Sequence, residues 1–281
     1  MRALIVGIDS SIGQALAHSL EKMNWLVSGT SRRPENRPRV YHLDLETMEG
    51  SKNLPECDHL FLCAALTNFS ACRENPLLAR KVNVDGPKAL IERFSPTGTH
   101  IVLLSTSAVF DGSLPRQKAE DTPNPTTEYG RTKTEAEKVL LSINQQSAIL
   151  RLTKVLSPKM PLFSGWVESL KKGNFISAFY NMFLAPITLD DAVESIIALA
   201  IQKRSGIFQA SATEDISYLE AALYLAKKLV VDSSLVVGMS AEDKTIPSKE
   251  RPRFTCLEVN LPKSSKMKES ITPFNSIDYI L

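Results

Sequence analysis

The sequence predicts an α/β protein with a doubly wound, mostly parallel sheet and a smaller C-terminal lobe. Three observations predict this class. Short apolar runs alternate with segments of helical periodicity through the first half of the chain. The first, fourth and fifth of these runs are continuously apolar, as in strands that are covered on both faces. The alternation stops near Pro158, where prolines, glycines and irregular runs begin. Strand followed by helix at this spacing implies crossover connections, and hence parallel strands.

The first strand and helix display the change of period most clearly. Residues 2–7 form an apolar run that ends in glycine, which predicts a buried strand. From Ile12 to Met23 the apolar residues recur on one helical face. Further strands are expected at residues 25–30, 39–44, 59–64, 100–105 and 147–152, and helical segments at 76–94 and 132–140.

The second half of the chain is less regular. Three elements are expected there: a helix at 190–203, a strand at 206–210 and a helix at 218–229. The tail at 245–270 is rich in Lys, Pro and Ser, which predicts loops over a site. Its cluster of Lys263, Lys266 and Lys268 is typical of a solvated loop.

The composition indicates an ordinary globular protein and excludes several classes. The net charge is +2 and the basic residues are dispersed, so we expect no nucleic-acid partner. No stretch approaches the ~20 apolar residues of a membrane span, and no signal peptide is recognisable, which favours the cytoplasm. The four cysteines and four histidines lack metal-ligand spacing, so we expect free thiols and no metal site.

A turn with two glycines joins the first strand to the first helix. Gly7 permits a tight turn, and Gly13 lets the helix pack close to the strands. Ser10 and Ser11 offer hydroxyls and amides at a helix N-terminus, where phosphate oxygens bind. The turn therefore favours a dinucleotide site, with an ordinary strand-to-helix loop as the alternative.

The second strand ends in Ser31, Arg32 and Arg33. An acidic residue at this place binds the ribose 2′-hydroxyl of NAD, whereas arginine suits the 2′-phosphate of NADP. The two arginines therefore indicate NADP(H), unless both are solvated surface residues. Asp44 and Leu45, which close the third strand, are expected to border the adenine.

Tyr129 and Lys133 lie four residues apart in a segment of helical pattern, so they share one helical face. A lysine ammonium favours the phenolate and thereby lowers the tyrosine pKa from about 10. Tyr129 is therefore a candidate proton donor to a developing alkoxide. The alternative is an exposed helical pair, because Tyr-x-x-x-Lys is common by chance.

Hydroxyl groups follow the fifth strand, at Thr106 and Ser107. Open α/β sheets bind ligands at the carboxyl ends of their strands. A hydroxyl there can hydrogen-bond a substrate carbonyl oxygen and stabilise the charge that develops on it. A serine-rich turn without a ligand is the alternative.

Eight segments recur in the order and spacing of a known family: residues 7–13, 63–67, 82–86, 105–112, 129–137, 151–158, 185–192 and 251–253. The chain resembles the extended short-chain dehydrogenase/reductase family along nearly its whole length. Within this family, part of the NAD-dependent epimerase/dehydratase superfamily, it is most similar to the dTDP-4-dehydrorhamnose reductase branch. The resemblance implies a Rossmann-like fold, NADP(H) and reduction of a ketone, the 4-keto group of a nucleotide-linked deoxysugar.

The resemblance also implies a role for individual residues. Tyr129 would be the general acid, Lys133 would lower its pKa and hold the nicotinamide ribose, and Thr106 would bind the carbonyl oxygen. Residues implied to bind the cofactor are Gly7, Ser10, Ser11, Ile12, Gly13, Ser31, Arg32, Arg33, Asp44, Leu45, Ala64, Ala65, Leu66, Asn83, Tyr129, Lys133 and Pro158. Residues implied to bind the substrate are Thr67, Ser107, Val109 and Arg253.

The end of the strand–helix alternation near Pro158 and the family resemblance together predict two structural units. Residues 1–156 are expected to form the NADP-binding domain, to which residues 186–210 return. Residues 157–185 and 211–281 are expected to form a smaller substrate-binding lobe. A homodimer is a further implication of the resemblance.

The chain departs from the family pattern at several places. Ser10 replaces the middle glycine of the turn, and Ser107-Ala108 replaces an Asp-Tyr pair. Thr153-Lys154 stands where the family has an aromatic residue, and an acidic residue expected near Ser70 is absent. Most departures lie on the substrate side, so the sequence does not assign the sugar. Two alternatives to a reductase stay open: an epimerase or dehydratase, and a regulatory subunit that binds NADP without turnover.

Overall fold

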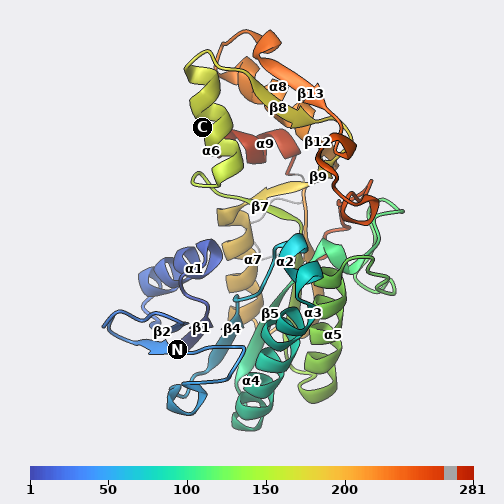
Figure 1. The fold of residues 1–281 in the computed structure, drawn as a ribbon. Coiled ribbons are helices and arrows are strands. Elements are labelled where there is room, and N and C mark those ends of the chain that lie inside the picture. The colour runs from blue at the N-terminus through green and yellow to red at the C-terminus, as the bar shows by residue number, and fades with distance from the viewer. Residues whose placement is uncertain (263–270) are drawn as a thin grey trace.

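The computed structural model describes residues 1–262 and 271–281, so the Lys263, Lys266 and Lys268 cluster lies outside the described residues. Its centre is a seven-stranded sheet in the order β11-β6-β5-β4-β1-β2-β3 (Figure 1). Every neighbouring pair in this sheet is parallel. The strands are β1 (Arg2–Val6), β2 (Leu26–Ser31), β3 (Val40–His42), β4 (His59–Leu62), β5 (His100–Thr106), β6 (Ala148–Leu152) and β11 (Gly206–Ala210). The predicted α/β class with a doubly wound parallel sheet is confirmed.

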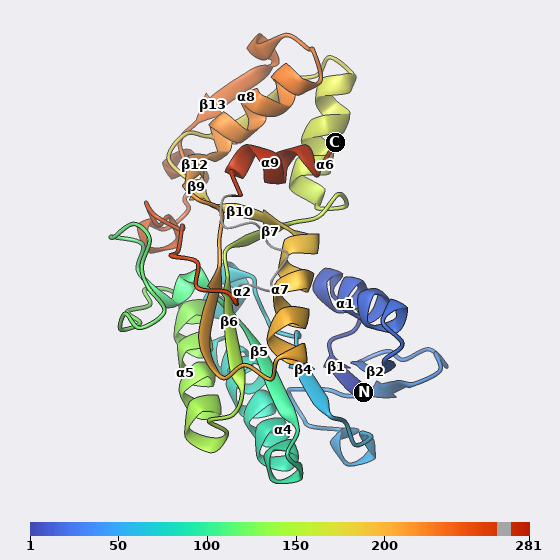
Figure 2. The ribbon, with the colours of Figure 1, turned by 180° about the vertical axis from the view of Figure 1, so that it is seen from behind.

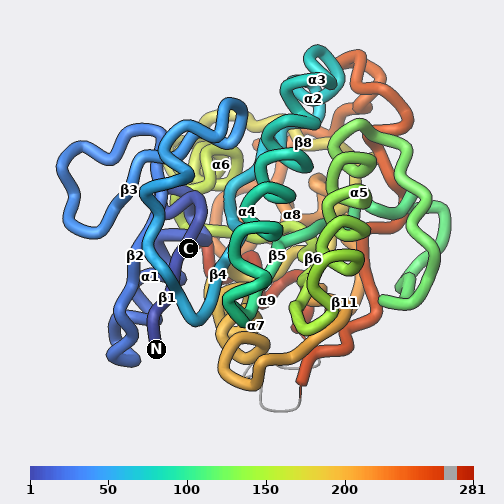
Figure 3. The backbone as a smooth tube through the Cα atoms, turned by 90° about the horizontal axis from the view of Figure 1, so that it is seen from below, coloured from blue at the N-terminus to red at the C-terminus, as the bar shows by residue number. Residues whose placement is uncertain are grey.

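Helices cover both faces of the sheet. On one face α1 (Ser11–Lys22) packs against α7 (Leu189–Ile201) (Figure 2). On the other, α4 (Gly86–Phe94) and α5 (Glu128–Ile143) run side by side (Figure 3). Successive side chains of β1 point to opposite faces of the sheet, and both sets are buried. Ala3 and Ile5 join the core under α1 and α7, and Leu4 and Val6 join the core under α4 and α5. This is why the strand is continuously apolar.

The helical segment predicted at residues 76–94 is continuous but not uniform. It consists of α3 (Pro76–Arg80), a π-helical turn η2 (Lys81–Asp85) and α4. A short helix that the sequence analysis did not predict, α2 (Phe69–Glu74), precedes it. Asn68 caps that helix by accepting a hydrogen bond from the Ala71 amide at 2.8 Å.

A second group of elements lies above the carboxyl edge of the sheet (Figures 1 and 2). Its helices are α6 (Pro161–Lys171), α8 (Tyr218–Lys228) and α9 (Pro273–Asp278). Its short strands pair as β8 (Ile176–Phe179) with β13 (Val236–Met239), β9 (Phe183–Leu184) with β12 (Ile216–Ser217), and β7 (Lys154–Leu156) with β10 (Pro186–Thr188). Most of these elements were not predicted, because strands of two to four residues are too short to display a period.

This lobe has its own apolar cluster. Phe163, Trp166, Leu170, Leu225 and Ile277 are buried together there, apart from the two clusters on the sheet. A separate core is what a separate unit of folding requires. We therefore propose the division into two units at the boundaries given above.

The helices among residues 1–262 and 271–281 include none that is long and apolar enough to cross a membrane. The four cysteines are free thiols.

Candidate functional site

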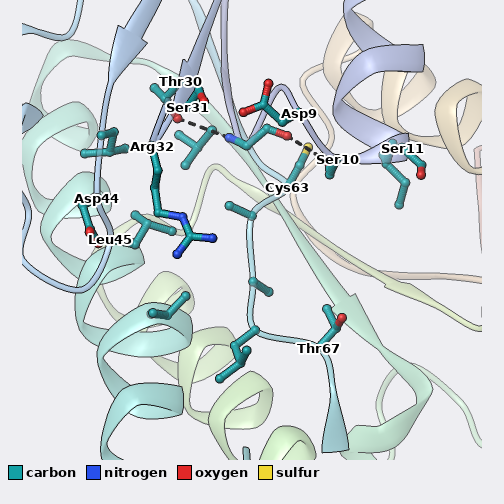
Figure 4. A pocket seen from close by; sticks show the side chains of 18 of the residues that line it. Asp9, Ser10, Ser11, Thr30, Ser31, Arg32, Asp44, Leu45, Cys63 and Thr67 are labelled. Carbon is teal, nitrogen blue, oxygen red and sulfur yellow. Dashed lines mark hydrogen bonds between the residues drawn. The ribbon is translucent and has the colours of Figure 1, made fainter. Parts of the chain in front are cut away.

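A cavity of about 570 Å³ opens at the carboxyl ends of β1, β2 and β4 (Figure 4). The strand order reverses here, since β1 lies between β2 and β4 in the sheet. Ligands of open α/β sheets bind at such a switch point. The cavity brings together many of the predicted cofactor residues: Gly7, Ser10, Ser11, Ile12, Ser31, Arg32, Asp44, Leu45, Ala64, Ala65 and Leu66. Of the predicted substrate residues, Thr67 lines it.

The two glycines of the turn after β1 let neighbouring parts of the chain pack closely against it. Gly7 has φ +88°, and a Cβ there would lie 2.7 Å from the Cβ of Ala64. A Cβ on Gly13 would meet the Gly7 carbonyl oxygen at 2.3 Å, so Gly13 lets α1 start directly beside the turn. The Ser10 hydroxyl caps α1 by accepting from the Gly13 amide at 3.0 Å. Ser10 has φ −70°, so this turn needs no glycine at the position where the family has one.

The end of β2 forms one wall of the cavity. The Thr30 hydroxyl accepts a hydrogen bond from the Gly7 amide at 3.2 Å and joins the wall to the turn. The Arg32 guanidinium points into the cavity (Figure 4). Arg33 is exposed and does not line it. Its amide donates to the Ser31 hydroxyl at 2.8 Å, which turns the chain away.

The opposite wall is the segment after β4, and Asn83 holds it in place. The Asn83 carboxamide accepts from the Leu66 amide at 2.7 Å and donates to the Leu66 carbonyl at 3.0 Å. It also donates to the Thr132 hydroxyl of α5 at 3.1 Å. Asn83 is 1% exposed, so it fixes the wall from behind instead of facing the cavity. The π-helical turn that carries it is a feature found frequently at functional sites.

Thr106 and Tyr129 meet beyond the end of β5. The Thr106 side chain acts on the Tyr129 hydroxyl through a hydrogen-bonding interaction that lowers the phenol pKa. The contact exists because the first turn of α5 lies against the loop after β5: a Cβ on Gly130 would meet the Ala108 carbonyl oxygen at 2.0 Å. The Thr127 hydroxyl caps α5 by accepting from the Gly130 amide at 3.0 Å. The Phe69 ring of α2 packs on Tyr129, with ring centroids 5.6 Å apart.

Lys133 follows one turn along α5 and is 4% exposed. None of the hydrogen bonds or ion pairs found among residues 1–262 and 271–281 involves its ammonium. Burial lowers its pKa to about 8, although the Glu137 carboxylate acts in the opposite direction. Glu137 is itself held by Arg151, with Nη2 2.8 Å from Oε2 in a buried pair. The next turn of the helix therefore supplies a fixed negative charge to the lysine.

The pKa of Tyr129 differs from the sequence-based expectation. Burial raises it to about 12, and the hydrogen bond from Thr106 opposes this rise. Lys133 is not among the groups that act on it here. Burial disfavours the charged form of both Tyr129 and Lys133. The Tyr129 phenol therefore stays protonated.

The remaining predicted residues lie outside the cavity. Val109 is buried with Phe110 and Leu257, and Arg253 is exposed over the Phe254 ring. Ser107 lies in the turn after β5. Pro158 is exposed, while its neighbours Ser157 and Met160 line the cavity. Lining residues that the sequence analysis did not assign to the site are Val6, Asp9, Thr30, Leu43, Glu46, Cys63, Leu78, Val82, Val155, Ser157, Met160 and Leu189.

The sheet and the placement of its cleft define a Rossmann-like α/β protein. The chain belongs to the family described as RmlD substrate binding domain, which matches residues 1–272. A curated relative, a probable low-salt glycan biosynthesis reductase of Haloferax volcanii, is 25% identical over 272 residues, covering 92% of this chain and 90% of the relative. Another, methionine adenosyltransferase 2 subunit beta of Bos taurus, is 26% identical over 305 residues, covering 97% and 88%.

Solved structures share the fold. A dTDP-4-dehydrorhamnose reductase from Bacillus anthracis in complex with NADP has a TM-score of 0.85 at 18% identity, covering 99% of this chain and 97% of that one. A UDP-glucose 4-epimerase from Thermus thermophilus in complex with NAD has a TM-score of 0.80 at 19% identity, covering 100% and 99%.

Proposed function

We propose that the protein is an NADPH-dependent reductase of a ketone, the 4-keto group of a nucleotide-linked deoxysugar. The observation that carries the proposal is the placement of the Thr106 and Tyr129 side chains together beside buried Lys133. None of the three residues is among those that line the cavity at the switch point of the sheet, but Lys133 is near enough to the lining residue Cys63 for each to shift the other's pKa. Their arrangement suits delivery of one proton to a bound carbonyl oxygen.

The residues of the cleft fit a nicotinamide dinucleotide. Gly7 leaves the space that a Cβ would fill against Ala64, so a pyrophosphate can approach the turn at the N-terminus of α1. Asp44 and Leu45 would border the adenine, and Ala64, Ala65 and Leu66 would line the opposite side. The dinucleotide would supply a hydride to the carbonyl carbon.

The protein's own side chains would act on the oxygen. Thr106 would hold the carbonyl oxygen by a hydrogen bond, and Tyr129 would donate its hydroxyl proton as negative charge develops there. The Lys133 ammonium would stabilise the tyrosinate that remains and hold the nicotinamide ribose. The hydride and the proton together convert the ketone to an alcohol.

The preference for NADP(H) rests on Arg32, whose guanidinium lines the cavity near the end of β2. A planar guanidinium matches a phosphate with two parallel hydrogen bonds. The Bacillus anthracis structure holds NADP and the Thermus thermophilus structure holds NAD, so both cofactors occur on this fold.

The substrate class follows two of the proteins named above, the probable low-salt glycan biosynthesis reductase and the dTDP-4-dehydrorhamnose reductase. Met160 and Ser157 line the cavity from the lobe side, and Thr67 lines it from the segment after β4. A nucleotide-linked sugar would lie between the sheet and the lobe. The homodimer and the cytoplasmic location stay predictions.

The proposal is tested by titrating the purified protein with NADPH and NADH, and then following NADPH absorbance with a panel of nucleotide-linked 4-keto sugars. Oxidation of NADPH by one of these sugars is the expected result. NADPH binding without turnover on any of them would favour a regulatory subunit instead. Interconversion of sugars with no net loss of NADPH would favour an epimerase.

A further inference from the structure

A carboxylate lines the cavity close to Ser31, the residue that precedes Arg32. Asp9 belongs to the turn after β1, lines the cavity and lies beside the end of β2 (Figure 4). The Ser31 side chain is near enough to lower the pKa of this carboxyl through a hydrogen-bonding interaction. An acidic group at the end of the second strand is what binds the ribose 2′-hydroxyl of NAD. In this protein such a group comes from the turn rather than from the strand.

The Asp9 carboxylate is paired with an arginine outside the cavity. Arg37 Nη2 lies 2.7 Å from Asp9 Oδ1. The same guanidinium donates to the Pro34 carbonyl at 3.1 Å and to the Arg33 carbonyl at 3.3 Å. Arg37 does not line the cavity, so its effect on a ligand there passes through Asp9. Arg37 and Ser31 also lower the pKa of Asp9 against the effect of burial, which keeps the carboxylate charged.

The charged side chains that line the cavity come close to balance once their partners Arg37 and Lys81 are counted. The lining has one cation, Arg32, and three carboxylates, those of Asp9, Asp44 and Glu46, in the part of the chain that the structure describes. Glu46 is partnered by Lys81 at 3.3 Å. If Asp9 lost its partner, its charge would face the 2′-phosphate of NADP(H), which carries up to about two negative charges. The same free carboxylate could accept a hydrogen bond from the 2′-hydroxyl of NAD(H).

We propose that Arg37 masks Asp9, and that this ion pair sets the preference of the cleft for NADP(H) over NAD(H). The inference rests on the proposed function, because it requires a nicotinamide dinucleotide in this cavity. Arg37 is then a specificity-determining residue that acts through Asp9, and Arg32 is the residue that meets the phosphate.

Three variants test the masking: Arg37→Gln, Asp9→Asn and the double variant. Glutamine keeps a donor for the Pro34 and Arg33 carbonyls but removes the charge. Each protein is titrated with NADPH and with NADH, and the ratio of the two Kd values is compared. Arg37→Gln is expected to reduce the preference for NADPH by up to about fivefold, the upper range for one exposed ion pair. The double variant is expected to recover the original ratio, because no carboxylate is left to mask.

The double variant distinguishes an effect of Arg37 through Asp9 from a direct effect of Arg37 on the phosphate or on the loop. A ratio that stays as low as in Arg37→Gln would mean that Arg37 binds the phosphate or orders the loop, and would overturn the proposal. An unchanged ratio in Arg37→Gln would overturn it as well. Arg2→Gln is the matched control, since it breaks a similarly exposed pair with Asp58, 3.0 Å apart, at the other end of the sheet. If the unaltered protein binds neither dinucleotide, the proposed function itself fails.

Discussion

Tyr129 and Lys133 illustrate at the scale of single residues how burial prepares a site for proton transfer. Burial raises the pKa of Tyr129 to about 12 and lowers that of Lys133 to about 8. Both shifts favour the uncharged form. Near neutral pH the tyrosine therefore keeps its proton, and the lysine still carries its own. The pair therefore has the protonation states that the proposed mechanism requires, a protonated phenol beside a cation.

Tyr129→Phe is expected to lower turnover by a factor of about 10² to 10⁴, because it removes the proposed general acid. NADPH affinity should change little, since the ring and its contact with Phe69 remain. Steady-state kinetics and an NADPH titration measure the two effects. Tyr218→Phe, at another tyrosine whose pKa burial raises to about 12, is the control and should keep full turnover.

The pH dependence of activity should report Lys133. Below about 8 its ammonium is present, and above that pH it is lost progressively, so kcat/KM is expected to fall as the pH rises through about 8. A pH profile of NADPH oxidation measures this limb. A profile that stays level far above that pH would remove Lys133 from the rate-determining chemistry.

At the scale of elements, the site depends on how closely α5 approaches the loop after β5. The sequence analysis placed Tyr129 and Lys133 on one helical face from their spacing alone. It did not predict α2, whose Phe69 covers Tyr129, or the π-helical turn that carries Asn83. Both depend on contacts between distant segments, as between Asn83 and Thr132.

Gly130→Ala tests the close packing of α5 against the loop after β5, because the added Cβ would lie 2.0 Å from the Ala108 carbonyl oxygen. We expect a loss of about 1 to 3 kcal/mol of stability and reduced turnover, as α5 and the Thr106 loop are forced apart. Denaturant unfolding and kinetics measure both.

Gly165→Ala is the matched control in α6, where a Cβ meets nothing within 4 Å. It is expected to stabilise the protein by up to about 1 kcal/mol through helix propensity alone. Equal effects of the two substitutions would contradict the proposed close contact.

At the scale of the whole molecule, two buried histidines lie at the amino ends of β4 and β5, remote from the cavity. His59 is 1% exposed and His100 is 4% exposed, and their rings are 5.6 Å apart. Burial, followed by the proximity of His100 and Lys203, lowers the pKa of His59 to about 4. Burial also lowers the pKa of His100.

These histidines should make the fold sensitive to acid. The unfolded chain binds protons on histidine below about 6.5, whereas folded His59 does so only near 4. Stability is therefore expected to fall as the pH drops through this window, by about 3 kcal/mol from His59. Denaturant unfolding at several pH values measures the slope. His59→Phe should flatten it, and His18→Gln, at an exposed histidine, should leave it as it is.

The sequence by itself determined the α/β class, the strands of the sheet and the turn at Gly7, because these depend on residue types at short spacing. It also placed Ser10, Arg32 and Ala64 in segments that form one cavity, since the carboxyl ends of parallel strands share an edge. Only the tertiary structure decided that Arg32 and not Arg33 lines that cavity, and that Asn83 supports its wall. It alone decided that Arg37 reaches Asp9. Such contacts join segments far apart in the chain, and no local pattern of residues encodes them.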